Sequence, residues 1–355
     1  MAYKILITGG AGFVGSNLAV FFKSNYPQYA VIVFDNLKRR GSELNISRLK
    51  SHGIEFVHGD LRNKEDFDSL PKVDFVIDAA AEPSVMAGLD AAPDYVINTN
   101  LTGTINCLNY AVKCNAGFLF LSSSRVYPFD ELDHSSFTES PTRFELKDNQ
   151  QTPGISSKGI NEHFPINGPR SFYGATKLAS ELLIAEYVEF LGLKAAVNRC
   201  GVITGPWQMG KVDQGVIVLW MARHFWKNNL TYNGYGGIGK QVRDILHIHD
   251  LFTLVDHQLH HIDQFSGKTF NVGGGNDCSV SLMELTALCE KITGNKITIT
   301  SVPENRKADV RIYVTDNSAI TNYCGWKPTY TPEKIMQEIF EWIQNNQQQL
   351  KEILN

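Results

Sequence analysis

The sequence lacks any block of like charges and any apolar run long enough to cross a membrane. Its 355 residues carry 33 Lys and Arg against 37 Asp and Glu, a formal net charge of −4. Proteins that bind nucleic acid or a membrane surface usually carry a basic patch or stripe, so the sequence argues against both partners. The apolar runs stay below the roughly 18 residues that a spanning helix needs. Since no signal peptide precedes the first apolar run, we expect a cytoplasmic protein.

Cysteine is scarce and irregularly spaced. The six cysteines form no C-x-x-C pair and no pairing pattern, which predicts free thiols in a reducing compartment and no metal site. His247-Ile248-His249-Asp250 could suggest a metal, but no further ligands are evident, and we interpret the segment as an ordinary strand. Repeats and low-complexity segments are also missing.

The first half of the sequence alternates short apolar runs with amphipathic segments. Expected strands are Lys4–Thr8, Val31–Asp35, Glu55–Gly59, Phe75–Asp78, Gly117–Ser122 and Lys194–Arg199, and expected helices include Ser16–Phe22, Leu101–Cys114 and Ala175–Leu191. This rhythm predicts an α/β fold, a Rossmann-type doubly wound parallel sheet with helices on both faces. Such sheets bind ligands at the carboxyl ends of their strands.

After residue 199 the rhythm is lost, which predicts a smaller, interleaved C-terminal domain. We expect residues 1–200 to form the cofactor-binding domain and residues 201–355 the substrate domain. Leu246–Asp250 and Thr269–Gly273 are expected to return to the main sheet as strands.

A glycine-rich turn follows the first expected strand. In Thr8-Gly9-Gly10-Ala11-Gly12-Phe13-Val14-Gly15-Ser16, the glycines at 9, 12 and 15 would give a tight turn, close approach to a pyrophosphate, and close packing of the next helix. Asp35 and Asn36 end the second strand, where a carboxylate can bind ribose hydroxyls and repel a 2′-phosphate. This favours NAD over NADP, although Lys38, Arg39 and Arg40 follow closely.

Small and polar residues follow the next three strands. Asp60 and Leu61 end the third, where the carboxylate could reach an adenine amino group. Ala79, Ala81 and Ser84 follow the fourth, and small residues there would let the main chain pass close to the cofactor. The fifth ends in the cluster Ser122-Ser123-Ser124, which would face the nicotinamide.

A tyrosine and a lysine four residues apart carry the chemistry. Tyr173 and Lys177 would lie one turn apart on the same face of a helix. Because a neighbouring cation favours the phenolate, the pair can act as a base near neutral pH.

Taken together, these motifs resemble the extended short-chain dehydrogenase/reductase family of NAD-dependent nucleotide-sugar epimerases and dehydratases. The likeness runs from about Ile5 to Pro328 and includes Asn100-Leu101-Thr102-Gly103-Thr104 and Tyr173-Gly174-Ala175-Thr176-Lys177. It implies that Tyr173 is the general base and acid, that Lys177 binds the nicotinamide ribose, and that Ser123 hydrogen-bonds the reacting hydroxyl. Asn100 would hold a loop at the cofactor. The implied substrate contacts are Ser84, Ser123, Ser124, Arg199, Gln214, Arg243 and Arg306, with the last two arginines near a diphosphate.

Other segments separate the branches of that family. Ser124-Arg125 stands where sugar dehydratases resemble one another in having an Asp-Glu pair, which argues against 4,6-dehydration. Val202 replaces the Asn of the commonest pattern, which weakens a UDP-galactose 4-epimerase reading. Asn36–Gly41, Asp213-Gln214-Gly215 and the insertion Thr138–Arg170 resemble the CDP-paratose 2-epimerase (CDP-tyvelose epimerase) branch, and thus O-antigen sugar biosynthesis.

Three functions stay open at this point. The first is an isomerase that oxidises C2 of a CDP-sugar to a 2-keto intermediate and reduces it on the other face. The second is a UDP-sugar 4-epimerase or a nucleotide-sugar reductase, and the third is a non-enzymatic NAD-binding scaffold or redox sensor. Family members often pair through the helices at 101–114 and 175–191, so we expect a homodimer or tetramer.

Overall fold

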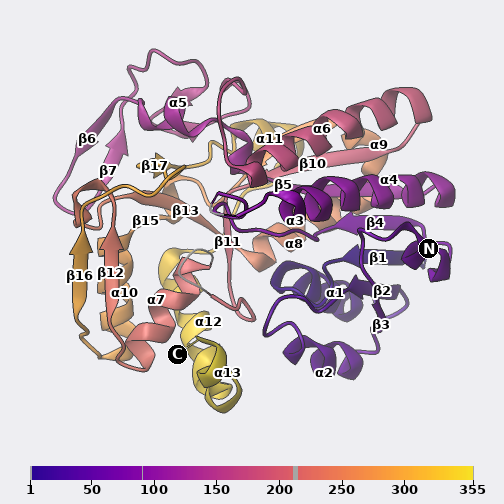
Figure 1. Cartoon of the computed structure of the whole chain (residues 1–355), viewed down its shortest axis with the longest axis horizontal. Coiled ribbons are helices and arrows are strands. Elements are labelled where there is room, and N and C mark those ends of the chain that lie inside the picture. Colours follow the sequence, from indigo (N-terminus) through magenta and orange to yellow (C-terminus); the bar gives the residue numbers. More distant parts are fainter. Residues whose placement is uncertain (1, 90, 211–214, 355) are drawn as a thin grey trace. The chain divides into compact units, whose positions relative to one another are not determined.

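A seven-stranded sheet organises the computed structural model, which describes residues 2–89, 91–210 and 215–354 (Figure 1). Its order is β14-β10-β5-β4-β1-β2-β3, and the pairings among β1 to β5 are parallel. The strands are β1 (Lys4–Thr8), β2 (Ala30–Asp35), β3 (Glu55–His58), β4 (Phe75–Asp78), β5 (Gly117–Ser123), β10 (Ala195–Cys200) and β14 (Lys268–Val272). The predicted Rossmann-type sheet and its strands are therefore confirmed.

The chain divides into two compact units. Unit 1 contains residues 1–126, 171–199 and 252–269, and unit 2 contains residues 127–170, 200–251 and 270–355. Residues 127–170 group with unit 2 although they precede residue 200. Residues 252–269 group with unit 1, in the part of the chain that is expected to return to the first domain.

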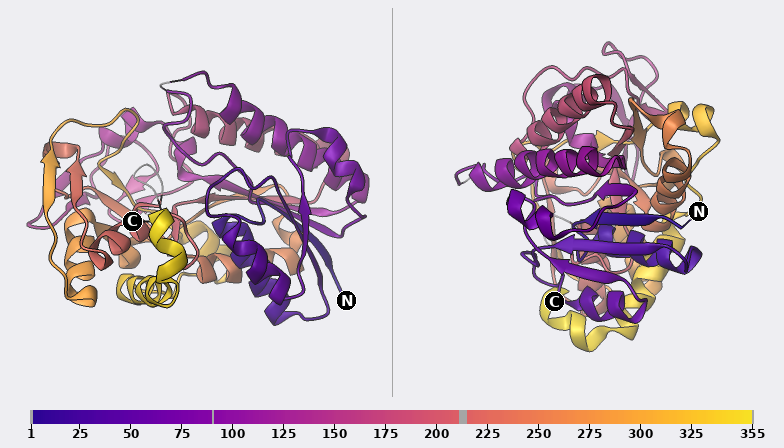
Figure 2. Two further views of the ribbon diagram at one scale, coloured as in Figure 1. Left: turned by 60° about the horizontal axis from the view of Figure 1, so that its bottom comes forward. Right: turned by 90° about the vertical axis from the view of Figure 1, so that its right-hand side faces the viewer.

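In unit 1, helices cover both faces of the sheet. Figure 1 shows α4 and α6 on one face and α1 and α2 on the other, and the end-on view in Figure 2 shows the same layers. The helices of this unit are α1 (Phe13–Asn25), α2 (Leu44–Ser51), η1 (Lys64–Ser69), α3 (Asp94–Ile97), η2 (Asn98–Thr102), α4 (Gly103–Cys114), η3 (Ser124–Val126), α6 (Phe172–Leu191), most of α8 (Ile248–His260) and α9 (Ile262–Phe265).

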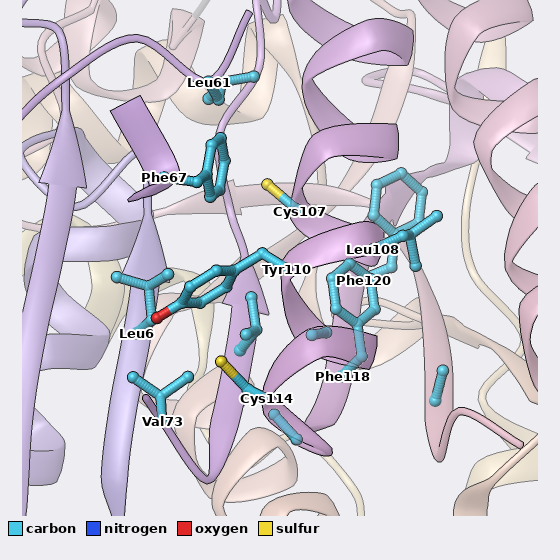
Figure 3. Close-up of a cluster of buried hydrophobic side chains, with 14 of the residues drawn as sticks. Leu6, Leu61, Phe67, Val73, Cys107, Leu108, Tyr110, Cys114, Phe118 and Phe120 are labelled. Carbon is cyan, nitrogen blue, oxygen red and sulfur yellow. The ribbon is translucent and has the colours of Figure 1, made fainter. Parts of the chain in front are cut away.

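One hydrophobic core cluster of unit 1 lies between the sheet and α4. Cys107, Leu108 and Tyr110 project from α4 among strand residues such as Leu6 and Phe118 (Figure 3). These five side chains are at most 5% exposed. Because both faces of the sheet are covered, its strands are continuous apolar runs rather than alternating ones.

Unit 2 is built from several small sheets and helices. β13 pairs with β11, β15 and β17, and separate pairs join β12 with β16, β6 with β7, and β8 with β9. The elements are α5 (Phe129–Asp133), β6 (Phe137–Glu139), β7 (Phe144–Leu146), β8 (Ile155–Ser156), β9 (Gly159–Ile160), β11 (Val202–Thr204), α7 (Val216–Phe225), β12 (Leu230–Asn233), η4 (Tyr235–Gly237), β13 (Val242–His247), η5 (Asn276–Cys278), β15 (Ser279–Ser281), α10 (Leu282–Thr293), β16 (Ile299–Val302), β17 (Ile312–Tyr313), α11 (Ser318–Cys324), α12 (Pro332–Asn345) and α13 (Gln347–Leu354).

The predicted strand Leu246–Asp250 is wrong. β13 ends at His247 and belongs to the smaller sheet, and α8 begins at Ile248. Asp250 lies in the first turn of α8, and its carboxylate accepts hydrogen bonds from the Thr329 hydroxyl and from the Thr329 and Tyr330 N–H groups. His247 stacks on the Tyr330 ring at 3.9 Å between centroids, so it has a packing role.

Candidate active site

The glycine turn joins β1 to α1 with main-chain atoms in close contact. Gly9 has φ +62°, and a Cβ there would lie 2.8 Å from the α-carbon of Ala80. A Cβ on Gly15 would lie 2.3 Å from the Gly9 carbonyl oxygen. Side chains at these two positions would therefore separate α1 from the end of the sheet, as the predicted close packing requires.

Gly12 leaves the positive end of α1 open. It stands at the N-cap without a side chain, and the first turn, which contains Phe13, Val14 and Gly15, has no acidic residue. The first N–H groups of a helix have no intrahelical acceptor, and the helix dipole favours an anion there. This turn therefore fits a pyrophosphate.

Asp35 holds the same turn from β2. Its carboxylate accepts hydrogen bonds from the Ala11 N–H at 3.1 Å and from the Leu37 N–H at 2.7 Å. Burial raises the pKa of Asp35, and N–H donors from Leu37, Ala11 and Gly12 oppose that rise. The carboxylate thus lies beside the anion-binding turn, where the sequence predicts a ribose contact.

Asp60, Asn36 and Arg62 form a second polar group at the ends of β2 and β3. Arg62 donates to both carboxylate oxygens of Asp60, at 2.9 and 2.6 Å, and Asn36 donates to Asp60 at 3.0 Å. The Arg62 guanidinium holds the pKa of Asp60 well below its usual range. Leu61 is buried against Gly103, and Arg62 also lies over the Tyr95 ring.

Asn100 fixes the loop that follows β4. Its amide accepts from the Glu82 N–H at 2.7 Å and donates to the Glu82 carbonyl at 3.1 Å and to the Thr176 hydroxyl at 3.2 Å. Asn100 lies in the π-helical turn η2, which interrupts the helix at this point. The amide therefore ties the loop with Ala79, Ala81 and Ser84 to α6, the helix that carries Tyr173 and Lys177.

Ser123, Tyr173 and Lys177 all belong to unit 1. Ser171 caps α6 by accepting a hydrogen bond from the Gly174 N–H, which places half-buried Tyr173 in the first turn. Lys177 is 2% exposed, and its ammonium donates to the Leu121 carbonyl at 2.8 Å. Ser123 ends β5, and its hydroxyl oxygen accepts from the Arg125 N–H at 3.1 Å. Because that contact uses an acceptor site, the hydroxyl proton can still be donated to another oxygen.

Arg199 is held by Glu181. Its Nε lies 3.1 and 3.0 Å from the two Glu181 oxygens, and its Nη2 lies 2.7 Å from Oε2. Glu181 also accepts from the Ser122 hydroxyl. This gives Arg199 a structural contact, while substrate binding by Arg199 stays a prediction. Sequence reasoning missed Glu181, although an acidic residue one turn after Lys177 in an apolar helix is a usable signal.

The other predicted substrate residues are divided between the two units. Ser124 begins η3 in unit 1. In unit 2, Arg243 pairs with Asp309 at 2.8 Å and also donates to the Val242 carbonyl. Arg306 belongs to the same unit, and Gln214 lies outside the described residues.

Neither a group of metal-ligating side chains nor a membrane-spanning helix occurs among the described residues. Within residues 2–89, 91–210 and 215–354, no three His, Cys, Asp or Glu side chains are grouped to hold an ion. No helix in those ranges is long and apolar enough to cross a membrane.

Comparisons with known proteins agree with this geometry. The chain is 33% identical over 353 residues to CDP-paratose 2-epimerase of Salmonella typhi, covering 96% of this chain and 98% of that protein. Among solved structures, it is similar to a UDP-glucose 4-epimerase with UDP-glucose from Thermotoga maritima, with a TM-score of 0.77 and 25% identity over 97% of this chain and 99% of that one. A dTDP-glucose 4,6-dehydratase from Bacillus anthracis in complex with NAD has a TM-score of 0.76 and 25% identity, over 99% of this chain and 100% of that one.

A family model extends this likeness over most of the chain. It matches residues 5–273, which contain the glycine turn, Asp35, Ser123, Tyr173 and Lys177. The cofactor of that family is NAD, and the open N-terminus of α1 with Asp35 beside it fits this dinucleotide. The chain therefore belongs to the NAD dependent epimerase/dehydratase family.

Proposed function

We propose that this protein is an NAD-dependent epimerase that inverts C2 of a CDP-linked sugar. The observation that carries the proposal is the 33% identity to CDP-paratose 2-epimerase, which extends over nearly the full length of both chains. Relatives named dTDP-glucose 4,6-dehydratase are 26% to 28% identical over similar lengths. Ser124-Arg125 in place of an Asp-Glu pair supports epimerisation over elimination, because elimination needs an additional acid and base.

The proposed chemistry needs three side chains of unit 1. NAD, when bound, supplies a reversible hydride acceptor. Tyr173 takes the proton from the sugar 2-hydroxyl and returns it when the 2-keto sugar has presented its other face. Ser123 donates a hydrogen bond to the same oxygen as its charge develops. Lys177 binds the nicotinamide ribose and favours the phenolate form of Tyr173.

We propose the following cofactor contacts, which the geometry of the glycine turn supports. The N–H groups of α1, from Phe13, Val14 and Gly15, would hold the pyrophosphate, and Asp35 with Asn36 would hold the adenosine ribose. Asp60 and Leu61 would border the adenine, and Ala79, Ala81 and Asn100 the nicotinamide side.

The remaining substrate contacts are proposed from the family resemblance. Arg243 and Arg306 would bind the diphosphate, for which a guanidinium fork has suitable geometry and charge. Arg243 would then exchange part of its contact with Asp309 for phosphate oxygens. Ser84, Ser124 and Gln214 would contact the sugar nucleotide, and the domain of residues 201–355 would determine which sugar nucleotide binds. We propose that the reaction belongs to O-antigen sugar biosynthesis.

We further propose a cytoplasmic homodimer, alone or within a tetramer, that forms through α6 and α4. Leu182, Phe190 and Leu191 of α6 are 60%, 76% and 56% exposed, which is unusual for large apolar side chains on one helix. Leu182→Glu should convert the dimer to monomer in light scattering with unchanged circular dichroism. Val302→Glu, at an exposed apolar residue of β16, is the matched control and should stay dimeric.

Product analysis by NMR tests the proposed reaction. Purified protein with NAD should interconvert CDP-paratose and CDP-tyvelose and leave UDP-glucose unchanged. A substrate with deuterium at C2 should keep the label in the product, because the same bound cofactor takes and returns the hydride. Tyr173→Phe is the control that should bind substrate and convert it more slowly, by about a hundredfold or more.

Any other result of this assay would support a different function. Conversion of UDP-glucose to its C4 epimer would replace the proposal with the 4-epimerase, which 28% identity to a putative UDP-glucose 4-epimerase of Methanocaldococcus jannaschii also supports. Stoichiometric consumption of NADH would indicate a reductase. Absence of turnover with retained NAD binding would support the scaffold or redox sensor.

A further inference from the structure

A buried polar cluster joins α6 to two neighbouring strands beside the proposed catalytic residues. It consists of Ser122 in β5, Glu181 in α6 and Arg199 in β10, which are 4%, 7% and 8% exposed. All three belong to unit 1. The Glu181 carboxylate accepts hydrogen bonds from the Ser122 hydroxyl and from the Arg199 guanidinium, so a single side chain links the helix to both strands.

The cluster lies close to Tyr173 and Lys177 along the helix. Glu181 follows Lys177 by four residues and Tyr173 by eight, so all three side chains fall near one face of α6. Lys177 contacts the Leu121 carbonyl and Glu181 contacts Ser122. Two consecutive residues of β5 therefore hold two consecutive turns of α6, immediately before Ser123.

The charges within the cluster cancel. A buried carboxylate is costly unless it is paired and hydrogen-bonded, and Arg199 approaches both oxygens of Glu181. A guanidinium stays protonated under all relevant conditions. The pair thus adds no net charge one turn from Lys177, where a lone carboxylate would oppose the effect of the ammonium on Tyr173.

We propose that Ser122, Glu181 and Arg199 are positioning residues that fix α6 in register with β5 and add no net charge beside Lys177 and Tyr173. This inference rests on the proposed roles of Tyr173 and Lys177. It assigns Arg199 to the support of the catalytic helix rather than to the substrate.

The size of the electrostatic effect follows from the helix geometry. Eight residues of helix span about 12 Å. At an effective dielectric constant of about 20, one uncompensated charge at that distance shifts a titration by about one pH unit. Glu181→Gln leaves the Arg199 cation alone and favours the phenolate, so the acid limb of the pH–rate profile should move down by about one unit. Arg199→Met leaves the Glu181 carboxylate without its cation, so the acid limb of the pH–rate profile should move to higher pH.

Other ionisable groups around α6 remain unchanged in these variants. Those on elements packed against it or beside Lys177 are Asp78 at the end of β4, Glu82 in the following loop, Asp94 and Tyr95 in α3, Arg125 in η3, and Cys107, Tyr110, Lys113 and Cys114 in α4. Asp78 accepts hydrogen bonds from the hydroxyls of Thr8 and Thr104. A difference between the variants therefore reports the charges of the cluster alone.

The experiment compares the parent protein with Glu181→Gln, Arg199→Met, the double variant and Ser122→Ala. One readout is the pH dependence of kcat and KM for CDP-paratose. The second is the phenolate absorbance titration of the NAD-loaded protein, taken as the difference from the same background with Tyr173→Phe. The double variant should titrate like the parent, since its net charge is the same. Ser122→Ala should lower kcat severalfold without moving the profile or KM.

Glu181→Gln decides the proposal, because it introduces no buried carboxylate and Arg199 stays charged. If its profile and its phenolate titration coincide with those of the parent, the electrostatic assignment is overturned. If Arg199→Met raises KM alone and Glu181→Gln has no effect on either constant, Arg199 is a substrate ligand instead. The phenolate titration needs no turnover, so a wrong substrate would contradict the proposed function and leave this test intact.

Discussion

Replacement of Lys177 by Met tests the central claim about the catalytic helix. Met has a similar length and suits a site that is 2% exposed, so the substitution removes the charge with little change in packing. The Leu121 carbonyl loses a donor, which costs about 1–3 kcal/mol of unfolding free energy, but the cost of burying an ammonium also disappears. We therefore expect a folded protein with a modest change in Tm.

The kinetic effect should be larger than the effect on stability. One helical turn separates Tyr173 from Lys177, about 6 Å, and an opposite charge at that distance contributes about 3 kcal/mol at an effective dielectric constant of about 20. This corresponds to about two pH units in the acid limb of the kcat profile. Turnover at pH 7 should fall roughly a hundredfold and recover as the pH is raised.

The assay is a pH–rate profile of the NAD-loaded protein with the substrate identified by NMR. Lys23→Met is a matched control, because Lys23 also donates to main-chain carbonyls, those of Pro27 and Tyr29, but lies on α1. Its profile should equal that of the parent. A Lys177→Met protein whose activity falls equally at every pH, or not at all, would refute the reasoning.

Three further perturbations test other parts of the structure. Tyr173→Phe should bind NAD and substrate with parental affinity and lower kcat by about a hundredfold or more, and unchanged turnover would remove the catalytic assignment. Gly15→Ala should abolish NAD binding in calorimetry or lower Tm by several degrees, because the new Cβ would lie 2.3 Å from the Gly9 carbonyl oxygen. Gly294→Ala is the control and should retain NAD binding, because a Cβ at Gly294 would have no atom within 4 Å. Burial, with the nearby His249 and Lys334, lowers the pKa of His247 to about 3 although Nε2 lies 3.2 Å from a Glu338 oxygen. The unfolded state then binds the proton more readily, so stability is complete above about pH 6.5 and falls by at most about 1.4 kcal/mol per pH unit below it. Chemical denaturation between pH 7 and pH 4 should show a weaker pH dependence in His247→Gln, and equal slopes would contradict this account.

Local patterns were sufficient for much of unit 1. The strands β1 to β5 could be predicted because a strand buried on both faces is a continuous apolar run. The glycine turn could be predicted because its spacing is imposed by main-chain contacts such as that between Gly9 and Gly15. The segment at residues 246–250 was predicted wrongly, since the same apolar alternation suits the end of β13 and the start of α8, and contacts from Thr329 and Tyr330 place the boundary.

The sequence by itself determined the fold class and the glycine turn after β1, and it predicts that Tyr173 and Lys177 act as a pair, because each depends on residues that are near one another along the chain. Only the tertiary structure decided which partners the buried polar groups take. Asn100 binds Glu82 and Thr176, and Arg199 binds Glu181, across 18 to 76 residues of sequence. The physical reason is that a buried charge or amide needs hydrogen-bond partners, and these are the donors and acceptors that the packed helices and strands bring within about 3 Å. No local sequence pattern specifies which residues those partners are.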